Sequence, residues 1–238
     1  PVLPNSLNTF NCQNNHLTSL PALPNSLTSL TCSYNQLTTL PALPNSLTVL
    51  NCSWNFLTSL PILPNSLAQL SCSYNSIISL PILPNSLTNL FCDKNNLSTL
   101  PPLPDSMQYL YCKYNNKLNC LPKLNRIINF EFTNTGIQCL PNYGNVTNSS
   151  PNIYSMPLCD LFNTNGCDVF WNIGGNVYSD DNTNCIADTN ETKLSFIKLN
   201  LYTNGNLIQS TYSNNFGQYS FDIDSGLFAV AVDTTGLS

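Results

Sequence analysis

The chain has 238 residues, of which 42% are hydrophobic and only 8% are charged, with a formal net charge of −5 at pH 7. Ordinary soluble domains carry roughly a quarter charged residues, so Asn, Ser and Thr must supply most of the surface polarity, which suits an extracellular protein. Scattered Lys and Arg residues argue against a nucleic-acid partner, and the lack of an apolar run of about 18 residues argues against a membrane span.

Residues 1–141 repeat a phrase of twenty residues, and residues 23–42 (LPNSLTSLTCSYNQLTTLPA) are a clear copy of it. Asparagines keep the same step between Asn15 and Asn115. Six cysteines also keep it without a slip: Cys12, Cys32, Cys52, Cys72, Cys92 and Cys112. A fixed period of this length predicts a solenoid, which is a scaffold for binding rather than for chemistry.

Each repeat divides into a short strand and a proline-rich return. The alternation in Leu30-Thr31-Cys32 predicts a strand. The return, LPALPNS, contains two prolines that fix φ and restrict the residues before them, so we expect extended chain on the convex side. One repeat should direct the following residues inward: Leu27, Leu30, Cys32, Asn35, Leu37 and Leu40.

The regularly spaced cysteines and asparagines, which we call the cysteine ladder and the asparagine ladder, each admit a functional and a structural interpretation. Aligned cysteines could form disulfides or hold a metal, but equivalent positions on adjacent strands give poor disulfide geometry, and free cysteine is often buried. We therefore expect free thiols in the core. The asparagines could bind a ligand, but a buried amide can instead satisfy the backbone of adjacent turns, and we expect that role.

The pattern LxxLxCxxNxLxxLPxLP resembles the bacterial-type leucine-rich repeats, with cysteine replacing the usual Val or Leu. The resemblance implies about seven repeats with a parallel β-sheet on a concave face. The chain begins at Pro1 in the middle of a repeat, so we expect the N-terminus to be truncated. Some members of that family carry a helical ubiquitin-ligase domain. Nothing in this chain resembles that domain, so the activity is not expected here.

The variable positions of the repeats are the candidate ligand-binding residues. Just before the ladder asparagines stands a mostly aromatic column: Tyr34, Trp54, Tyr74, Lys94 and Tyr114. Phe91 and Tyr111 lie inside the expected strands. Aromatic side chains with few charges suit contact with a protein or a glycan on the concave face. Repetition alone would also preserve an aromatic residue that packs on its neighbour, so the sequence leaves both interpretations open.

Four further cysteines lie near the end of the repeats. Cys159 and Cys167 enclose a short segment with an Asn-Gly turn, which makes them a disulfide candidate. Cys120 and Cys139 occupy the same repeat position in successive turns, and they could form a second disulfide or remain two packed thiols. Disulfides would indicate an oxidising compartment. The surrounding residues 142–170 have no clear period and predict a capping loop and hinge.

Residues 171–238 have a different sequence pattern, in which short expected strands alternate with frequent turns. This pattern predicts a small antiparallel β-sandwich. The Asn204-Gly205 pair is the strongest hairpin signal. The expected strands cover residues 169–179, 193–203, 207–213, 217–223 and 227–233. The fold class expected for the whole chain is therefore mostly β, with a leucine-rich-repeat solenoid before the sandwich.

The segment DDNTNCIADTNE, between the first two expected strands, has the oxygen spacing of a calcium loop. The ligands would be Asp180, Asn182, Asn184, Asp188 and Glu191, with the carbonyl of Ile186. An EF-hand needs glycine where this chain has Cys185, and no flanking helix is expected, so the loop is not an EF-hand. An Asn- and Asp-rich hairpin loop without metal is the alternative.

Residues 172–238 also resemble the SdrD-type B domain, a collagen-adhesin-B-like sandwich, through GGNVYSDDNTNC, KLNLYTNGNL and GQYSF. The resemblance implies Ca²⁺ in the same loop and a stalk module in a longer, multi-domain surface protein. Some such proteins are exported by gliding-type bacteria through the type IX route. The implied location is extracellular or the cell surface, and the module is expected to be incomplete at its C-terminus.

No catalytic constellation is visible in the sequence. His16 is the only histidine, and the serine-rich repeats provide no base for a nucleophile. We therefore expect a non-enzymatic adhesin whose solenoid binds a protein or glycan while a calcium-stiffened module presents it. The alternative is a structural segment of a long extracellular filament or surface layer without a specific ligand.

Overall fold

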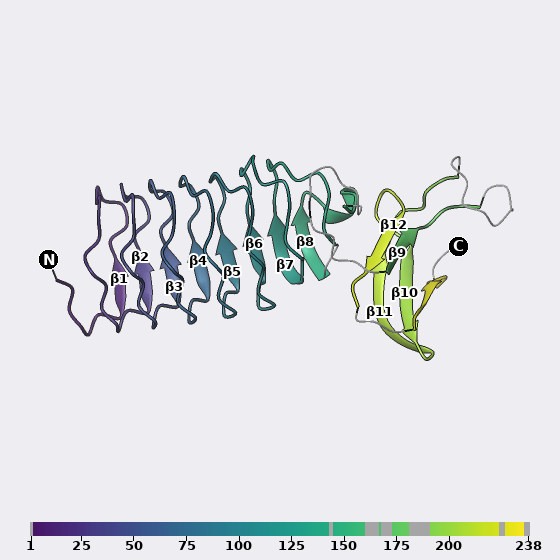
Figure 1. Cartoon of the computed structure of the whole chain (residues 1–238), viewed down its shortest axis with the longest axis horizontal. Coiled ribbons are helices and arrows are strands. Elements are labelled where there is room, and N and C mark those ends of the chain that lie inside the picture. Colours follow the sequence, from purple (N-terminus) through teal and green to yellow (C-terminus); the bar gives the residue numbers. More distant parts are fainter. Residues whose placement is uncertain are drawn as a thin grey trace. The chain divides into compact units, whose positions relative to one another are not determined.

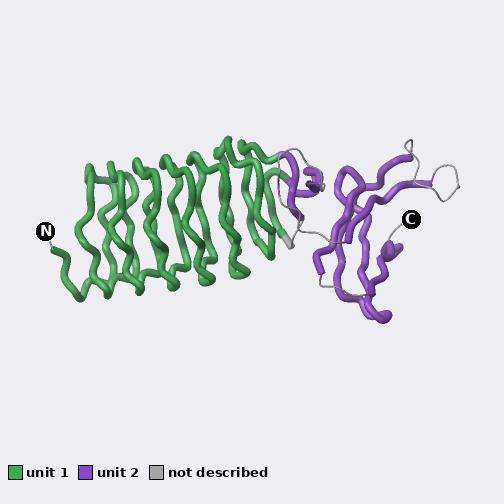
Figure 2. Tube along the Cα trace, viewed as in Figure 1, with its two compact units in different colours: residues 1–137, 144–151 green, residues 138–143, 152–238 purple. Residues whose placement is uncertain are grey.

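The computed structural model describes residues 2–142, 145–159, 167, 173–180, 191–223 and 227–235. It consists of two units, residues 1–137 with 144–151 and residues 138–143 with 152–238 (Figure 2). Each unit is described by itself. Within the described ranges, no helix has the length and apolar character that crossing a bilayer requires.

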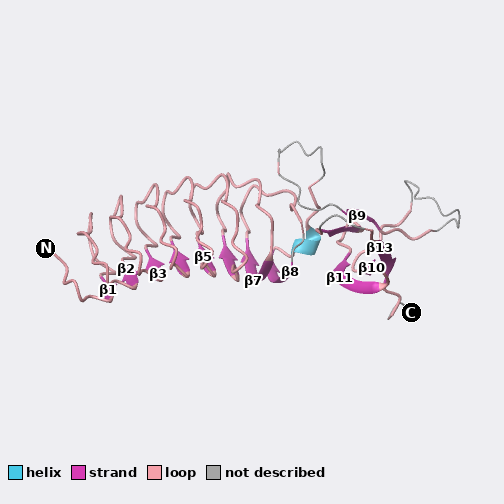
Figure 3. Cartoon of the chain, turned by 60° about the horizontal axis from the view of Figure 1, so that its bottom comes forward, coloured by secondary structure: helices cyan, strands magenta, loops and turns pink. Residues whose placement is uncertain are grey.

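The first unit is a solenoid with one parallel sheet along one side and loops along the other (Figures 1 and 3). Each strand pairs with the next one in sequence, so that Leu30 lies opposite Leu50 and Leu70 opposite Leu90. The strands are β1 (Thr9–Asn11), β2 (Ser29–Thr31), β3 (Val49–Asn51), β4 (Gln69–Ser71), β5 (Asn89–Phe91), β6 (Tyr109–Tyr111), β7 (Arg126–Glu131) and β8 (Asn145–Ser150). The predicted parallel solenoid is confirmed.

The core of the solenoid is a stack of identical inward positions. Leu30 and Cys32 are fully buried, and so are their counterparts Leu50 and Cys52 one turn later. The return segments between residue 20 and the start of β6 contain neither helix nor strand. Short strands and proline-rich returns therefore repeat as predicted, because each turn can bury its apolar side only against its neighbours.

The prediction of a capping loop from residue 142 onwards is wrong for residues 145–150, which form β8. This strand pairs in parallel with β7, with Ile127 opposite Val146. The offset between those partners is 19 residues rather than the 20 of earlier repeats, as between Leu30 and Leu50. The Asn- and Ser-rich composition concealed this turn. Pairing with β8 also satisfies backbone groups that β7 would otherwise expose as an edge strand.

The second unit contains two small antiparallel sheets. One has the order β11-β10-β13 and the other pairs β12 with β9. Their bounds are β9 (Ile173–Asn176), β10 (Lys198–Thr203), β11 (Asn206–Tyr212), β12 (Gln218–Phe221) and β13 (Ala229–Val232), and a short 3-10 helix, η1 (Ile153–Ser155), precedes them. Leu199, Leu201 and Phe221 form the buried core between the sheets. Each predicted strand overlaps one observed strand.

The predicted Asn-Gly hairpin is also confirmed. Asn204 and Gly205 have φ values of 48° and 78° and connect β10 to β11. Two successive left-handed residues define the turn type that matches the twist of paired strands.

Candidate functional site

The ladder asparagines close each turn of the solenoid, and this fixes the backbone beside the aromatic column. The Asn55 amide donates to the carbonyls of Cys32, Cys52 and Ser53 at 3.0, 3.1 and 3.3 Å. Its Oδ1 accepts from the backbone N–H of Leu37 at 2.9 Å. Asn55 is 6% exposed, so these contacts occupy an amide that is hidden from solvent. The structural role predicted for the ladder is confirmed.

The residue before each ladder asparagine has a left-handed backbone. Trp54 has a φ of 57°, a conformation that costs a non-glycine residue roughly 1–2 kcal/mol. Backbone hydrogen bonds to the next turn hold it there, from Trp54 N to Ser73 O at 2.9 Å and from Asn55 N to Tyr74 O at 3.3 Å. The same conformation occurs at Tyr34, Tyr74, Lys94 and Tyr114. The column therefore lies in the turns that follow the strands, not within the strands.

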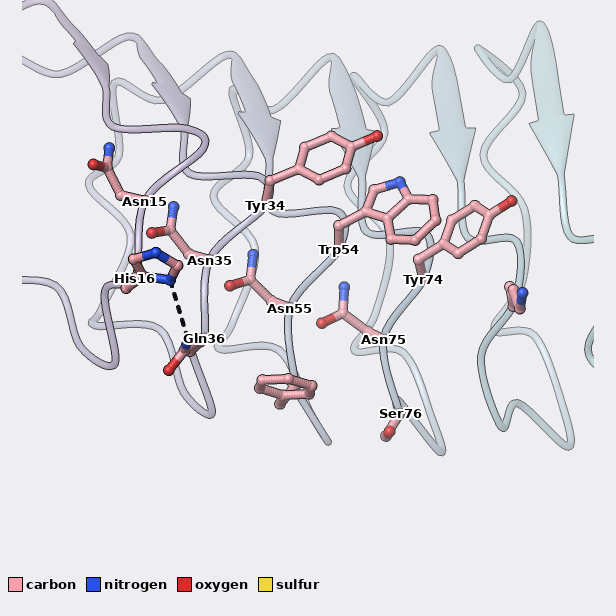
Figure 4. Close-up of a pocket in the computed structure, with 12 residues that line it drawn as sticks. Asn15, His16, Tyr34, Asn35, Gln36, Trp54, Asn55, Tyr74, Asn75 and Ser76 are labelled. Carbon is pink, nitrogen blue, oxygen red and sulfur yellow. Dashed lines mark hydrogen bonds between the residues drawn. The ribbon is translucent and has the colours of Figure 1, made fainter.

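Part of the column is a continuous stack (Figure 4). The ring centroids of Tyr34 and Trp54 are 5.2 Å apart with planes 11° from parallel, and those of Trp54 and Tyr74 are 3.7 Å apart at 10°. Lys94 Nζ lies 4.9 Å from the Tyr74 ring centroid and continues the stack. We call these four residues the aromatic stack. Tyr34 and Trp54 remain 50% and 42% exposed, although stacking covers the surfaces that their rings turn toward each other.

The aromatic stack forms one wall of a shallow groove of about 590 Å³. In Figure 4, the ladder asparagines lie between this wall and a second row of side chains. The second row consists of His16, Gln36, Phe56 and Ser76, each one residue after a ladder asparagine. Gln36 Nε2 and His16 Nδ1 are 3.2 Å apart, and Phe56 is 61% exposed. Lys94 is the only Lys, Arg, Asp or Glu in the groove lining.

The sequence missed this second row, although its twenty-residue spacing is visible. Its members share no chemical type, and only the fold shows that they face the aromatic stack. His16 belongs to this row, and the groove lining holds no carboxylate or thiol that could work with it as an acid, base or nucleophile.

The remaining predicted ligand residues lie elsewhere on the solenoid. Phe91 and Tyr111 are on adjacent strands, β5 and β6, with centroids 5.0 Å apart. Tyr111 also lies beside Lys113, whose Nζ is 5.7 Å from the ring centroid and 2.7 Å from Glu131 Oε2. Tyr114 is 51% exposed and does not line the groove. The seven predicted residues therefore divide into the aromatic stack, a pair on the strands, and Tyr114.

The half-buried Asp93 belongs to the surroundings of the pair on the strands. Its Oδ1 accepts from the backbone N–H of Lys113 at 2.8 Å. Burial raises the pKa of Asp93, and this outweighs the lowering effects of that hydrogen bond and of the Lys113 charge. Asp93 thus joins the turn after β5 to the turn after β6, although its burial disfavours the ionised carboxylate.

The cysteine ladder consists of free thiols, as predicted. Cys32 to Cys112 are buried and Cys12 is partly exposed. Burial raises the pKa of Cys32 and Cys72 to about 12, so these thiols stay protonated and unreactive at neutral pH. The ladder serves as core material rather than as a metal site.

The predicted disulfide pairing is wrong, although all four cysteines are disulfide-bonded. Cys139 pairs with Cys159, at a Cα–Cα distance of 4.9 Å and a sequence separation of 20 residues. That pair excludes both Cys159–Cys167 and Cys120–Cys139. The reason is that Leu140 is bridged in parallel to Leu158, so the neighbouring Cys139 and Cys159 lie on segments that run side by side.

The calcium loop lies mostly outside the described residues, which include Asp180 and Glu191 but not Asn182, Asn184, Ile186 or Asp188. The chain on either side of the loop is paired. Tyr178 and Lys193 form an antiparallel bridge, and Ser179 N donates to Thr192 O at 2.8 Å. This pairing brings the first and last predicted ligands to the base of one loop. Carboxylate, amide and carbonyl oxygens are the donors that Ca²⁺ prefers, so the donor set fits the ion.

Comparison with known proteins matches residues 171–237 to the family described as SdrD B-like domain. The chain is similar to YopM from Yersinia enterocolitica WA-314, with 29% sequence identity and a TM-score of 0.50, over 63% of this chain and 40% of that chain. It is also similar to YopM from Yersinia pestis, described as a leucine-rich effector protein, with 30% identity and a TM-score of 0.46, over 68% and 56% of the two chains. No curated protein matches the chain.

The chain thus covers less than half of the Yersinia enterocolitica protein's length, so the activity of that protein as a whole is not transferred here. In this chain, the turns from Asn15 to Asn95 each combine a short parallel strand, a ladder asparagine and an LPxLP return. Both folds are typical of binding or structural proteins rather than enzymes. The chain therefore joins a leucine-rich-repeat solenoid to an SdrD B-like domain.

Proposed function

We propose that the protein is a non-enzymatic surface adhesin whose solenoid binds a protein ligand in the groove beside the aromatic stack. The observation that carries the proposal is the half-exposed stack of Tyr34, Trp54 and Tyr74 along a groove with a single charged residue, Lys94. Aromatic side chains that keep exposed edges and lose little rotamer freedom are typical anchors of protein interfaces. The SdrD B-like domain, typical of surface adhesins, supports the same class of function.

The stack geometry favours a protein over a glycan as ligand. A sugar ring is held against aromatic side chains through the face of the aromatic ring. In this stack both faces of Trp54 are covered, by Tyr34 and Tyr74, and one face of Tyr74 lies against Lys94. The ring edges and the exposed Phe56 remain available, and they suit the apolar side chains and backbone carbonyls of a polypeptide.

Calcium binding by the second unit is part of the proposal. Asp180, Asp188 and Glu191 would supply carboxylates, Asn182 and Asn184 amide oxygens, and Ile186 a backbone carbonyl. The paired chain at Tyr178 and Lys193 supports a closed loop whose ends are already held together. A bound ion would stiffen a module whose described buried core is small.

The stack also supports a second candidate function, a structural segment without a ligand. Stacked rings on successive turns stabilise the solenoid by themselves, at about 0.5–1.5 kcal/mol for each pair beyond their buried area. In that case the groove would be a by-product of repetition.

A binding experiment separates these functions. A random peptide library is panned against the full chain, against Phe56→Asp, and against the control Ile78→Asp. Phe56 and Ile78 are both 61% exposed, but only Phe56 lines the groove. We expect selected peptides to bind the wild type and Ile78→Asp equally and to lose at least tenfold in affinity for Phe56→Asp. A glycan array is probed in parallel. Groove-dependent glycan binding would overturn the protein-ligand assignment, and binding in neither experiment would favour the structural segment.

A further inference from the structure

A second apolar surface, on the return segments, is unused by the proposed function. It consists of the middle residue of successive LPxLP phrases, and we call Ala42, Ile62, Ile82 and Pro102 the return stripe. Ile62 and Ile82 are 88% and 87% exposed, although isoleucine is among the residues most often buried in folded proteins. Shallow grooves of about 550 and 540 Å³ flank Ile62 on either side, one toward Ala42 and the other toward Ile82.

We propose that the partner in the groove is the return stripe of a second copy of this chain. The inference rests on the groove being a binding site, as proposed above, and names its occupant. Each residue of the return stripe belongs to a proline-rich, extended return segment, and extended proline-rich chains are recognised by grooves lined with aromatic side chains.

The two surfaces repeat at the same interval. Each turn of the solenoid contributes one residue to each surface, and the stripe residue follows the stack residue by eight positions, as Ile62 follows Trp54 and Ile82 follows Tyr74. In a parallel, unshifted arrangement, successive turns of one copy therefore face the same turns of the other. Ile62 and Ile82 of one copy then lie opposite Trp54 and Tyr74 of the other.

A pair of opposite charges favours the parallel, unshifted arrangement of the two copies. Lys94 ends the aromatic stack, and Asp105 lies three residues after Pro102, in the same turn. Earlier return segments carry an asparagine where this one has Asp105, as at Asn65 and Asn85. Asp105 is exposed, with Oδ1 accepting from Asn125 Nδ2 at 2.8 Å. Unshifted parallel docking places Lys94 against the turn that carries Asp105, whereas an antiparallel arrangement places it against uncharged turns.

The groove and the stripe share no residue, so one copy can use both at once. A contact between two different surfaces is heterologous, and without closure by rotation it continues as an open array. Self-association would thus present many copies of the chain side by side, which increases the avidity of weak surface contacts.

Sedimentation velocity on the full chain tests the proposal with two complementary variants. The groove variant is Phe56→Asp and the stripe variant is Ile62→Asp with Ile82→Asp; all three side chains are highly exposed, so folding should be unaffected. The wild type should show a sedimentation coefficient that rises with concentration, while each variant stays monomeric. A mixture of the two variants should form one-to-one dimers and nothing larger, because only one intact groove and one intact stripe can meet.

The charge pair gives an independent readout. Lys94→Glu and Asp105→Lys should each weaken wild-type association severalfold, and the combined variant should restore it. A monomeric wild type, variants that associate like the wild type, or a mixture that stays monomeric would each overturn the inference. If the wild type is monomeric but library peptides still bind in the groove, the proposed function stands and only the second-copy assignment fails.

Discussion

Removal of one ladder asparagine, by Asn55→Ala, tests how the turns beside the aromatic stack are held. The amide of Asn55 donates to backbone carbonyls of two turns, and its Oδ1 accepts from Leu37 N. Alanine leaves the buried Leu37 N–H without a partner, which costs about 1–3 kcal/mol, and removes donors from at least two carbonyls. The sum is a loss of roughly 2–4 kcal/mol in the free energy of unfolding.

Urea unfolding followed by circular dichroism measures this loss, with Asn65→Ala as the matched control. Asn65 is an exposed asparagine of a return segment, and its replacement should change stability by no more than about 0.5 kcal/mol. Equal unfolding midpoints for wild type and Asn55→Ala would refute the structural role of the ladder. The amide would then have to be explained by a ligand.

Three further predictions follow from the ladder, the strand surface and the loop. Native-state alkylation mapped by mass spectrometry should label the partly exposed Cys12 well before Cys52, whose pKa is raised well above its usual value by burial; equal labelling would contradict a closed core. Asp93→Asn keeps an acceptor for Lys113 N and removes a carboxylate whose pKa is raised by burial, so the variant should have a higher urea midpoint than the wild type at pH 7. This advantage should disappear below about pH 4, where Asp93 is protonated in both the folded and the unfolded state. A gain in stability that does not depend on pH would contradict this cause. Calcium at a hundredfold excess over Kd should stabilise the second unit by about 2.7 kcal/mol and leave the solenoid unchanged, whereas identical melting of the second unit with and without chelator would exclude the ion.

The solenoid was predictable because successive turns bury apolar residues at equivalent positions. Leu30 and Cys32 are buried on either side of the partly exposed Thr31, and the same order returns at Leu50 and Cys52, so this periodicity fixes strand, register and core. The Asn204-Gly205 hairpin was predictable for a local reason, since its turn demands positive φ at both residues.

The groove and the disulfide depend on contacts between turns, which a repeat pattern does not specify. The sequence identified Trp54 as a variable residue, but its left-handed backbone and parallel stacking on Tyr74 follow from hydrogen bonds to the next turn. Phe56 was missed because its row mixes residue types. Cys139 and Cys159 were paired wrongly because the parallel bridge between Leu140 and Leu158, which brings them together, joins segments on either side of a stretch whose composition is typical of a loop.

Binding of a polypeptide in the groove can be measured as the affinity of a library-selected peptide for Phe56→Asp relative to Ile78→Asp. Both side chains are equally exposed, so the two variants differ mainly in whether the new charge lies in the groove. A loss of at least tenfold for Phe56→Asp alone is the predicted result. Equal affinities for the two variants would contradict binding in this groove.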